Sequence, residues 1–455
     1  MKLEYQNWRF TMTLSRRQFL SRSAVGAMAF TFVPSRVFGA NDKLNIAAIG
    51  SGGMGGANIA ALSSQNIVAL CDVDDNQAAG TYRKFPDVPK FRDFRIMLDK
   101  MDKQIDAVLV ATPDHTHAVA AMAAIKRRKH VYVQKPLTRT VYEARMLTEA
   151  ARKYGVVSQM GNQGSSGEGV RSVCEWLWDG AIGKVREVHA WTNRPVWPQG
   201  IDRPEDTHEV PESLDWDLWL GPSPYRPYHP MYLPFSWRAW QDFGTGALGD
   251  MACHILDPVF KALKLKYPVS VEGSVAMRCK EMWRPTMSTE TYPDASMIHY
   301  QFPERGDMPA VKLTWYDGGL MPRRPDELEE GRGMGDGNGG VLFVGDEGKL
   351  MCGCYGLDPQ LIPSDRMQDY KQPEKSIPRI TTSHEMHWVE CCRSGETPSS
   401  TFDYAGPFTE SIVMGNLLTR FPNRKILWDG DAMAVTNLPE ANDWVNRPYR
   451  EGWSL

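Results

Sequence analysis

Apolar and polar positions alternate in blocks along the first third of the chain. The apolar runs have the length of buried strands, and they occupy residues 44–49, 67–71, 107–110, 130–133 and 156–159. Helix-forming segments fall between some of them, at residues 57–62 and 118–128. Strands that alternate with helices predict a parallel sheet covered by helices, the doubly wound α/β arrangement.

The later part of the chain predicts elements of both kinds. Residues 340–351 have the pattern of two strands joined by a Gly-Asp-Glu-Gly turn. Residues 402–420 predict a helix, which we expect to pack back on the first domain. Six glycines between residues 331 and 340 predict a mobile loop that could act as a lid.

The composition is that of a globular protein and excludes several classes. The 455 residues carry 52 basic and 55 acidic side chains, a formal charge of −3, so we expect no nucleic-acid partner. A hydrophobic content of 42% with 10% aromatic residues excludes a disordered chain. No apolar run reaches the roughly 18 residues that stable membrane insertion needs.

The first 40 residues have the pattern of an export signal. Arg16-Arg17 precedes a short apolar stretch, residues 24–33, and the small residues Gly39 and Ala40 follow. This order is typical of a twin-arginine signal peptide, which we expect to cover residues 1–40 and to send the folded protein to the periplasm. A basic amphipathic helix is the alternative, but the lack of acidic residues around this stretch counts against it.

The eight cysteines do not form a disulfide framework, because they are few in a large chain and one lies in a predicted strand. Cys352 and Cys354, and His384 and His387, invite interpretation as metal ligands. A structural zinc site would need a second closing pair, which the sequence lacks. We therefore expect no metal site.

A glycine-rich turn follows the first predicted strand. Residues 50–55 read Gly-Ser-Gly-Gly-Met-Gly, and a helix-forming segment comes next. Glycines in this pattern allow a tight turn and bring backbone N–H groups close to a pyrophosphate. Asp72 ends the next strand, where an acid binds ribose hydroxyls and repels a 2′-phosphate. The set predicts NAD as the cofactor, with NADP left open because Arg83 and Lys84 follow.

Polar residues also follow the next two strands. Thr112 and Pro113 come after the strand at 107–110, at the sheet edge where such folds hold ligands. His115 and His117 open the following helix, and we expect them to cap and pack it rather than to bind a metal. The strand at 130–133 then leads to Gln134-Lys135-Pro136.

The sequence resembles the Gfo/Idh/MocA family of sugar oxidoreductases, the group of glucose–fructose oxidoreductase and inositol dehydrogenase. That family places a Lys-Pro pair after a strand, here Lys135-Pro136, although its usual preceding Glu is replaced by Gln134. Its second hallmark is an aspartate followed four residues later by a histidine, matched by Asp250 and His254 behind a glycine-rich stretch. The resemblance extends from about residue 44 to the C-terminus.

The resemblance implies two domains after the signal. They are an NAD-binding Rossmann domain over residues 41–164 and a substrate-binding α+β domain over residues 165–455, with a large, mainly antiparallel open sheet. We expect this sheet to form a homo-oligomer. The residues expected around the cofactor are Gly50, Gly52, Gly53, Met54, Gly55, Asp72, Thr112, Pro113, His117, Gln134, Lys135, Asn162 and Gln163. Asn162 and Gln163 could equally belong to an ordinary polar turn.

Lys135, Asp250 and His254 have the chemistry that alcohol oxidation needs. At i, i+4 on a helix, Asp250 and His254 share one face and can point at one hydroxyl. A histidine suits the removal of the O–H proton, and a lysine ammonium stabilises the alkoxide. Whether Lys135 or His254 is the base stays open. A surface Asp–His pair without catalytic function is the alternative.

Tryptophan is concentrated between the two predicted sets of catalytic residues. Six of the 15 tryptophans lie between residues 191 and 240. Sugars stack on aromatic rings, although large aromatic residues also fix loops to a core. We expect most of the six to be structural and Trp197 and Trp240 to lie near the substrate, with Arg194 and Arg238 as polar neighbours.

These features predict an exported NAD(P)-dependent dehydrogenase that oxidises a ring hydroxyl of a sugar, glycoside or inositol. An NAD-dependent glycosidase, working by transient oxidation, elimination and re-reduction, is the alternative. A non-catalytic sugar-binding protein is a third hypothesis. Because the periplasm offers no free NAD pool, we expect a tightly bound cofactor that a second substrate recycles.

Overall fold

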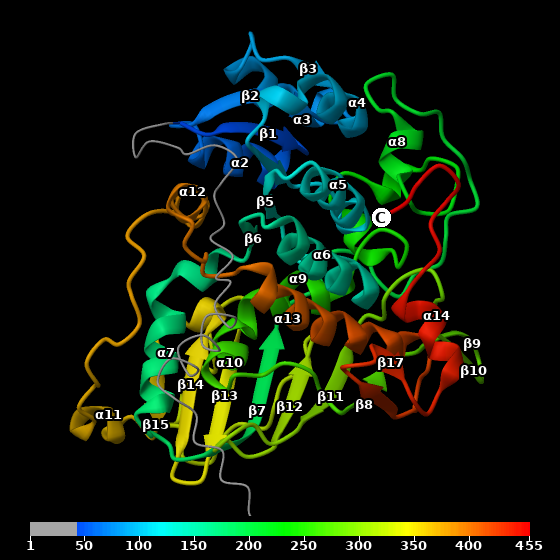
Figure 1. Ribbon diagram of the computed structural model, residues 1–455. Coiled ribbons are helices and arrows are strands. Elements are labelled where there is room, and N and C mark those ends of the chain that lie inside the picture. Colours follow the sequence, from blue (N-terminus) through cyan, green and yellow to red (C-terminus); the bar gives the residue numbers. More distant parts are fainter. Residues whose placement is uncertain (1–42) are drawn as a thin grey trace, which may run out of the picture. The chain divides into compact units, whose positions relative to one another are not determined.

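The computed structural model describes residues 43–455, so the predicted signal peptide lies outside the described residues. A parallel sheet comes first, with the strand order β3-β2-β1-β4-β5-β6 (Figure 1). Its strands are β1 (Asn45–Ile49), β2 (Asn66–Cys71), β3 (Lys90–Phe91), β4 (Ala107–Val110), β5 (His130–Val133) and β6 (Ser158–Met160). The predicted Rossmann arrangement is confirmed.

Helices connect these strands: α2 (Gly53–Ala61), α3 (Asp75–Lys84), α4 (Phe94–Met101), α5 (Asp114–Lys126) and α6 (Val141–Tyr154). Helices α2 and α5 begin one turn earlier than the apolar pattern predicts, because glycine and polar residues occupy their first turns. Helix α6 begins with a capping box in which Thr140 and Glu143 exchange hydrogen bonds of 3.0 and 3.2 Å.

A second, larger sheet follows, with the order β15-β14-β13-β7-β12-β11-β8-β16-β17. Its strands are β7 (Val185–Thr192), β8 (Ser270–Val275), β11 (Ser296–Phe302), β12 (Val311–Tyr316), β13 (Gly339–Gly345), β14 (Lys349–Gly353), β15 (Gln360–Ile362), β16 (Ile426–Asp429) and β17 (Ala434–Val435). Among the described strands of this second sheet, only β7 and β12 pair in parallel, so the mainly antiparallel sheet is confirmed. Strands β9 (Arg278–Glu281) and β10 (Arg284–Thr286) form a separate hairpin.

The second domain adds helices of two lengths, of which α9 (Gly246–Ile255) and α13 (Phe402–Met414) lie between the two sheets (Figure 1). The longer ones are α7 (Glu168–Trp178), α9 (Gly246–Ile255), α10 (Asp257–Ala262), α12 (His384–Ser394) and α13 (Phe402–Met414), and the short ones are α8 (Trp216–Leu220), α11 (Asp365–Asp369) and α14 (Asn442–Val445). Helix α13 packs against α6 and α9, and Arg145 of α6 forms an ion pair of 2.8 Å with Glu410 of α13. This contact fixes the second domain against the first.

The segment 193–243, which we call the aromatic segment, forms a hydrophobic cluster of its own. Its buried members include Trp197, Trp216, Trp219, Trp237 and Trp240. The rings of Trp216 and Trp219 stack with centroids 4.8 Å apart. These side chains give a long irregular segment a rigid core.

Residues 331–340 differ in part from the expected mobile loop. Gly339 and Gly340 belong to strand β13, where they pair with Thr192 and Trp191 of β7. Asp336 Oδ2 accepts a hydrogen bond of 2.8 Å from the backbone N–H of Cys354. The end of the segment is therefore anchored to the sheet, while residues 331–338 form the predicted loop.

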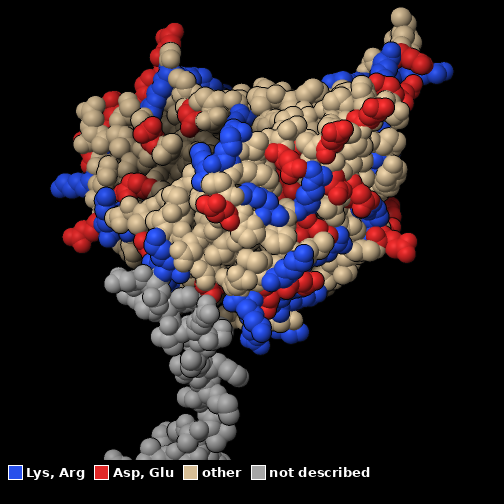
Figure 2. Space-filling model, turned by 90° about the horizontal axis from the view of Figure 1, so that it is seen from above, with Lys and Arg blue, Asp and Glu red and all other residues tan. Residues whose placement is uncertain are grey.

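The surface of the described residues carries charges of both signs. On the face seen in Figure 2, basic and acidic side chains are intermixed rather than separated into single-sign areas. Between residues 43 and 455, no helix has both the length and the apolar character needed to cross a membrane.

Candidate functional site

A cleft of about 410 Å³ lies between the two domains. One wall consists of residues that follow strands β1, β2, β4 and β5, among them Gly50, Asp72, Thr112 and Lys135. The aromatic segment supplies the opposite wall through residues 218–219 and 233–238. The carboxyl ends of parallel strands are where α/β folds bind their ligands.

The glycine turn of the first wall fits a dinucleotide phosphate. A Cβ atom on Gly50 would stand 2.5 Å from the carbonyl oxygen of Ala111, and one on Gly55 would stand 2.1 Å from that of Gly50. Gly53 adopts φ +49° with open space around it. Because Gly52 provides no side-chain cap, the first N–H groups of α2 are left for an anion.

Asp72 fixes the same turn. Its Oδ2 accepts hydrogen bonds from the backbone N–H groups of Ser51 (2.7 Å) and Gly52 (3.2 Å), and its Oδ1 accepts one from Asp74 (3.0 Å). Burial raises the pKa of Asp72, although these hydrogen bonds oppose the shift. The carboxylate lies on the cleft wall, where it can also accept from a ribose.

Lys135, Asp250 and His254 come together across the domain boundary. Lys135 follows β5, whereas Asp250 and His254 both lie on α9, so the predicted shared helix is confirmed. Lys135 Nζ donates to Asp250 Oδ1 (2.8 Å) and to the carbonyl oxygen of Asp250 (3.0 Å). The His254 ring meets the edge of the Tyr355 ring at 4.9 Å.

The electrostatics of this group follow from burial and charge. Burial alone would raise the pKa of Asp250, but the charges of Lys135 and Arg238 hold it well below its ordinary value. Burial and the charge of Lys135 lower the pKa of His254 to about 3. Its buried Nδ1 has no hydrogen-bond partner among the described residues. His254 is therefore a neutral imidazole with a ring nitrogen available.

Gln134 stands where the family resemblance leads us to expect Glu. Its Oε1 accepts from the backbone N–H of Lys135 (3.3 Å), and its Nε2 donates to Asn58 Oδ1 (2.9 Å). Asn58 in turn donates to Glu385 Oε1 of α12 (2.8 Å). A glutamate could not make the donated bond to Asn58. The neutral residue thus links Lys135 to a carboxylate of the second domain.

Several residues predicted to hold the cofactor lie below the cleft instead. His117 is 1% exposed, and its ring nitrogens face the carbonyl oxygens of Thr112 (2.8 Å) and Pro136 (2.9 Å). It therefore positions the two loops rather than contacting a ligand. Asn162 is also 1% exposed and faces the carbonyl oxygen of Cys253 at 3.4 Å. Gln163 lies beside a different hollow, next to Ser166 and His384.

Two arginines predicted near the substrate reach the site, but the two tryptophans do not. Arg238 Nε lies 3.1 Å from Asp250 Oδ1, and Arg194 Nε lies 3.9 Å from Asp250 Oδ2. Trp240 is 1% exposed and Trp197 is 6% exposed, because both rings pack inside the aromatic cluster. Their assignment to the substrate is wrong in this structure.

Sequence reasoning missed other residues of the cleft. Trp219 and Trp237 are the tryptophans that line it. Asp114 also lines it and accepts a hydrogen bond from Thr245 (2.6 Å), while burial raises its pKa to about 7. Asp114 directly follows Thr112 and Pro113, which the sequence places at the ligand-binding edge of the sheet, so its position could have indicated it. Tyr355 adopts φ +62°, a left-handed backbone conformation that no sequence pattern predicts.

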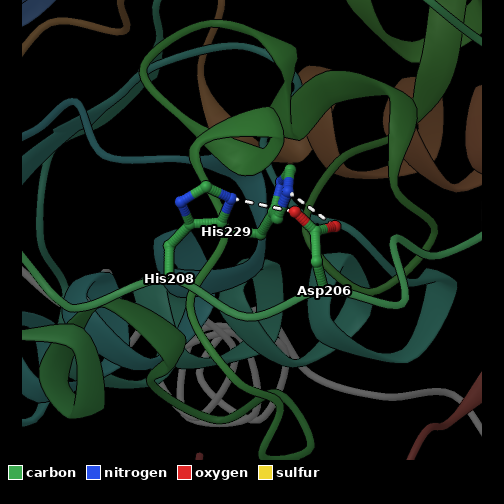
Figure 3. A group of neighbouring side chains, drawn as sticks. All are labelled: Asp206, His208 and His229. Atoms are coloured by element: carbon green, nitrogen blue, oxygen red, sulfur yellow. Dashed lines mark hydrogen bonds and ion pairs between the residues drawn. The ribbon is translucent and has the colours of Figure 1, made fainter.

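One group with metal-ligand chemistry was also missed. Asp206, His208 and His229 meet on the aromatic segment, with His208 Nε2 and His229 Nε2 at 3.1 and 3.4 Å from the Asp206 oxygens (Figure 3). However, His229 Nδ1 accepts a hydrogen bond from the N–H of Met231 (3.0 Å). A neutral imidazole then carries its proton on Nε2, facing the carboxylate. The contacts fit a hydrogen-bonded group rather than a metal site.

The cysteines stand apart from this group. All eight are free thiols, and Cys352, Cys354, Cys391 and Cys392 are buried. Cys391 Sγ lies 3.6 Å from His387 Nε2, a contact between neighbouring turns of α12.

Comparison with protein families identifies both domains. Residues 44–162 match the family model described as oxidoreductase family, NAD-binding Rossmann fold, and residues 184–299 match that of the C-terminal alpha/beta domain of the same family. The two matches cover more than half of the chain. The first domain is accordingly an NAD-binding domain.

Individual relatives agree with these matches. A levoglucosan dehydrogenase of Pseudarthrobacter phenanthrenivorans is 27% identical over 227 residues, which are 47% of this chain and 50% of that protein. Inositol 2-dehydrogenase 2 of Saccharopolyspora erythraea is 28% identical over 39% of this chain and 53% of its own length. The chain thus matches about half the length of these curated relatives.

A solved structure of levoglucosan dehydrogenase with NADH and levoglucosan has a TM-score of 0.57 to this chain. The alignment covers 85% of this chain and 99% of that one at 20% identity. At this identity the likeness shows a shared two-domain fold.

Proposed function

The chain belongs to the Gfo/Idh/MocA oxidoreductase family, and on that premise we propose that it is an exported, NAD-dependent enzyme that oxidises a ring hydroxyl of a sugar, glycoside or inositol. Two relatives are named for dehydrogenation of levoglucosan and inositol, which are compounds of this class. The ion pair of Lys135 with Asp250 carries the proposal, because it joins a residue of the cleft wall in the cofactor domain to α9 of the second domain.

Lys135, Asp250 and His254 have separate tasks in removing the hydroxyl proton. Lys135 is held in place by its ion pair with Asp250 and donates to the oxygen as negative charge develops on it. His254 is neutral, its buried Nδ1 has no hydrogen-bond partner among the described residues, and we assign it the acceptance of the proton. The carboxylate charge of Asp250, which lies four residues before His254 on the same helix, then stabilises the imidazolium. NAD, when bound, supplies the hydride acceptor.

We also expect the cofactor to be tightly bound. The aromatic segment pairs with the edge of the cofactor domain beside Asp72, where Asp215 N donates to the carbonyl oxygen of Val73 (2.8 Å) and Asp75 N to that of Ser213 (3.0 Å). Ser213 Oγ adds a hydrogen bond to Asp74 Oδ1 (3.0 Å). A dinucleotide in the cleft would leave only after these bonds open. A second substrate would then regenerate the oxidised cofactor in place.

Export rests on the sequence of residues 1–40. A variant with Arg16 and Arg17 both changed to Lys should stay in the cytoplasm when the full chain is produced in a host with a twin-arginine pathway. Periplasmic recovery of that variant at the level of the unchanged chain would contradict export by this route.

The enzymatic proposal has a direct test. Denaturation of the purified protein should release NAD in near-stoichiometric amount, which mass spectrometry identifies. In the folded protein, absorbance at the NADH maximum should rise when inositols or glycosides are added. No change with any compound of the class would overturn the proposal. Release of nitrophenol from aryl glycosides without net NADH would instead identify a redox-neutral glycosidase.

A further inference from the structure

The carboxylate of Asp250 stands among three cations. Lys135, Arg238 and Arg194 approach it at 2.8, 3.1 and 3.9 Å, and their side chains are only 14%, 20% and 22% exposed. Between residues 43 and 455, none of the three has another carboxylate within 4.0 Å. One negative charge therefore faces three positive charges in a largely desolvated site.

The nearest further acid does not remove this excess. Asp114 lies close enough to interact with Arg238 and Lys135, and burial raises its pKa to about 7. Even when ionised, it leaves three cations against two carboxylates.

Both arginines are held in place for a ligand. The Arg238 guanidinium lies over the rings of Phe235 (4.0 Å) and Trp237 (4.2 Å), and Arg238 lines the cleft. Arg194 follows the end of β7 and donates from Nη1 to Asn193 Oδ1, and Asn193 Nδ2 in turn donates to the carbonyl oxygen of Gly337 (2.6 Å). Arginines fixed in this way lose little side-chain entropy when they bind an anion.

We infer that the substrate carries a carboxylate, as in a uronic acid or its glycoside, and that Arg194 and Arg238 bind it. The inference rests on the proposed sugar substrate and names its class. A carboxylate accepts charge-assisted hydrogen bonds from both guanidinium groups. It also neutralises part of the positive charge that Asp250 alone does not neutralise. A neutral sugar would leave that charge desolvated and unbalanced.

Binding to the NADH-loaded protein tests the inference separately from catalysis, because reduced cofactor cannot oxidise the sugar. Calorimetry would compare methyl glucuronide with methyl glucoside, and methyl galacturonide with methyl galactoside. At least one acid should bind about tenfold or more tightly than its neutral partner, the usual effect of a charge-assisted hydrogen bond. NADH formation with oxidised cofactor should show the same preference in kcat/KM.

Variants identify the residues responsible. Arg194→Gln and Arg238→Gln should each reduce the acid-to-neutral ratio by about tenfold, whereas Arg194→Lys should retain most of it. Arg203→Gln is the matched control, since Arg203 pairs with Glu290 at the surface of the same segment. A change in NADH affinity without a change in the ratio would assign Arg238 to the cofactor and overturn the inference.

The outcomes separate this inference from the proposed function. Selective, arginine-dependent binding of an acid without turnover would support the inference and contradict the enzymatic proposal. Turnover of both members of each pair at equal kcat/KM would do the reverse. Failure of both acids to bind, or tighter binding of glucose 6-phosphate than of either acid, would overturn the carboxylate assignment.

Discussion

Substitution of Gly55 by alanine should damage the cofactor site, whereas the same change at Gly56 should not. A Cβ on Gly55 would stand 2.1 Å from the Gly50 carbonyl oxygen and 3.3 Å from Ala111 Cβ. Contacts under 3.0 Å are essentially never seen, so α2 must move by about 0.9 Å from the strand. At Gly56 the nearest atom is the Thr81 hydroxyl at 3.0 Å, so a shift of a few tenths of an ångström relieves the contact.

The expected costs follow from these contacts. Overpacking at Gly55→Ala should destabilise the protein by about 1–3 kcal/mol. Movement of the first turn of α2 should also remove an N–H contact to the pyrophosphate, which weakens NADH binding by about tenfold or more. At Gly56, alanine is more favourable than glycine in a helix by up to about 1 kcal/mol, which offsets the smaller cost of the Thr81 contact.

Thermal unfolding and NADH titration measure both effects. The melting temperature of Gly55→Ala should fall by roughly 2–4 °C for each kcal/mol lost, and that of Gly56→Ala should stay near the unchanged protein. Wild-type NADH affinity in Gly55→Ala would refute the close-packing argument. Equal losses in both variants would show that general helix distortion, rather than the Gly50 contact, is responsible.

Three further predictions concern charge. Because burial and the charge of Lys135 lower the pKa of His254 to about 3, His254 remains unprotonated, and kcat/KM should stay level from about pH 8 to about pH 5. The pH profile is measured in Asp114→Asn, which removes the titration of Asp114. A fall in kcat/KM below about pH 6.5 would contradict a neutral His254 with a lowered pKa. Asp250→Asn should lower kcat by a factor on the order of 10³ with little change in NADH affinity, since Lys135 loses its ion-pair partner; stopped-flow absorbance and fluorescence titration check the two quantities. Asp72→Asn should shift the NADH-to-NADPH affinity ratio by about tenfold toward NADPH, as repulsion of a 2′-phosphate is relieved, and an unchanged ratio would assign Asp72 to the glycine turn alone.

The first domain was predictable because parallel strands buried on both faces are continuous apolar runs. Strands β4 and β5 have the predicted bounds for that reason. Helix α5 begins at Asp114 rather than at Ala118, because its polar first turn faces the cleft and breaks the apolar pattern. In the second domain, the antiparallel sheet came from the family resemblance rather than from periodicity.

Site residues were predictable where a local rule places them. The spacing of Asp250 and His254 puts them on one helix face, and the strand end delivers Lys135. Tertiary packing, which no local pattern encodes, decides which tryptophans face the cleft, so Trp240 was assigned wrongly. Tyr355 approaches His254 through a left-handed backbone conformation between distant elements.

Transfer of hydrogen from sugar carbon to the nicotinamide is the most direct measure of the proposed reaction. The purified protein would be incubated with perdeuterated inositols and glycosides, denatured, and its nucleotide analysed by mass spectrometry. Deuterium is expected in the nicotinamide of the unchanged protein and of Lys126→Met, an exposed control, and none in Lys135→Met. Absence of deuterium from the unchanged protein with every compound, or equal labelling in Lys135→Met, would contradict the proposed reaction.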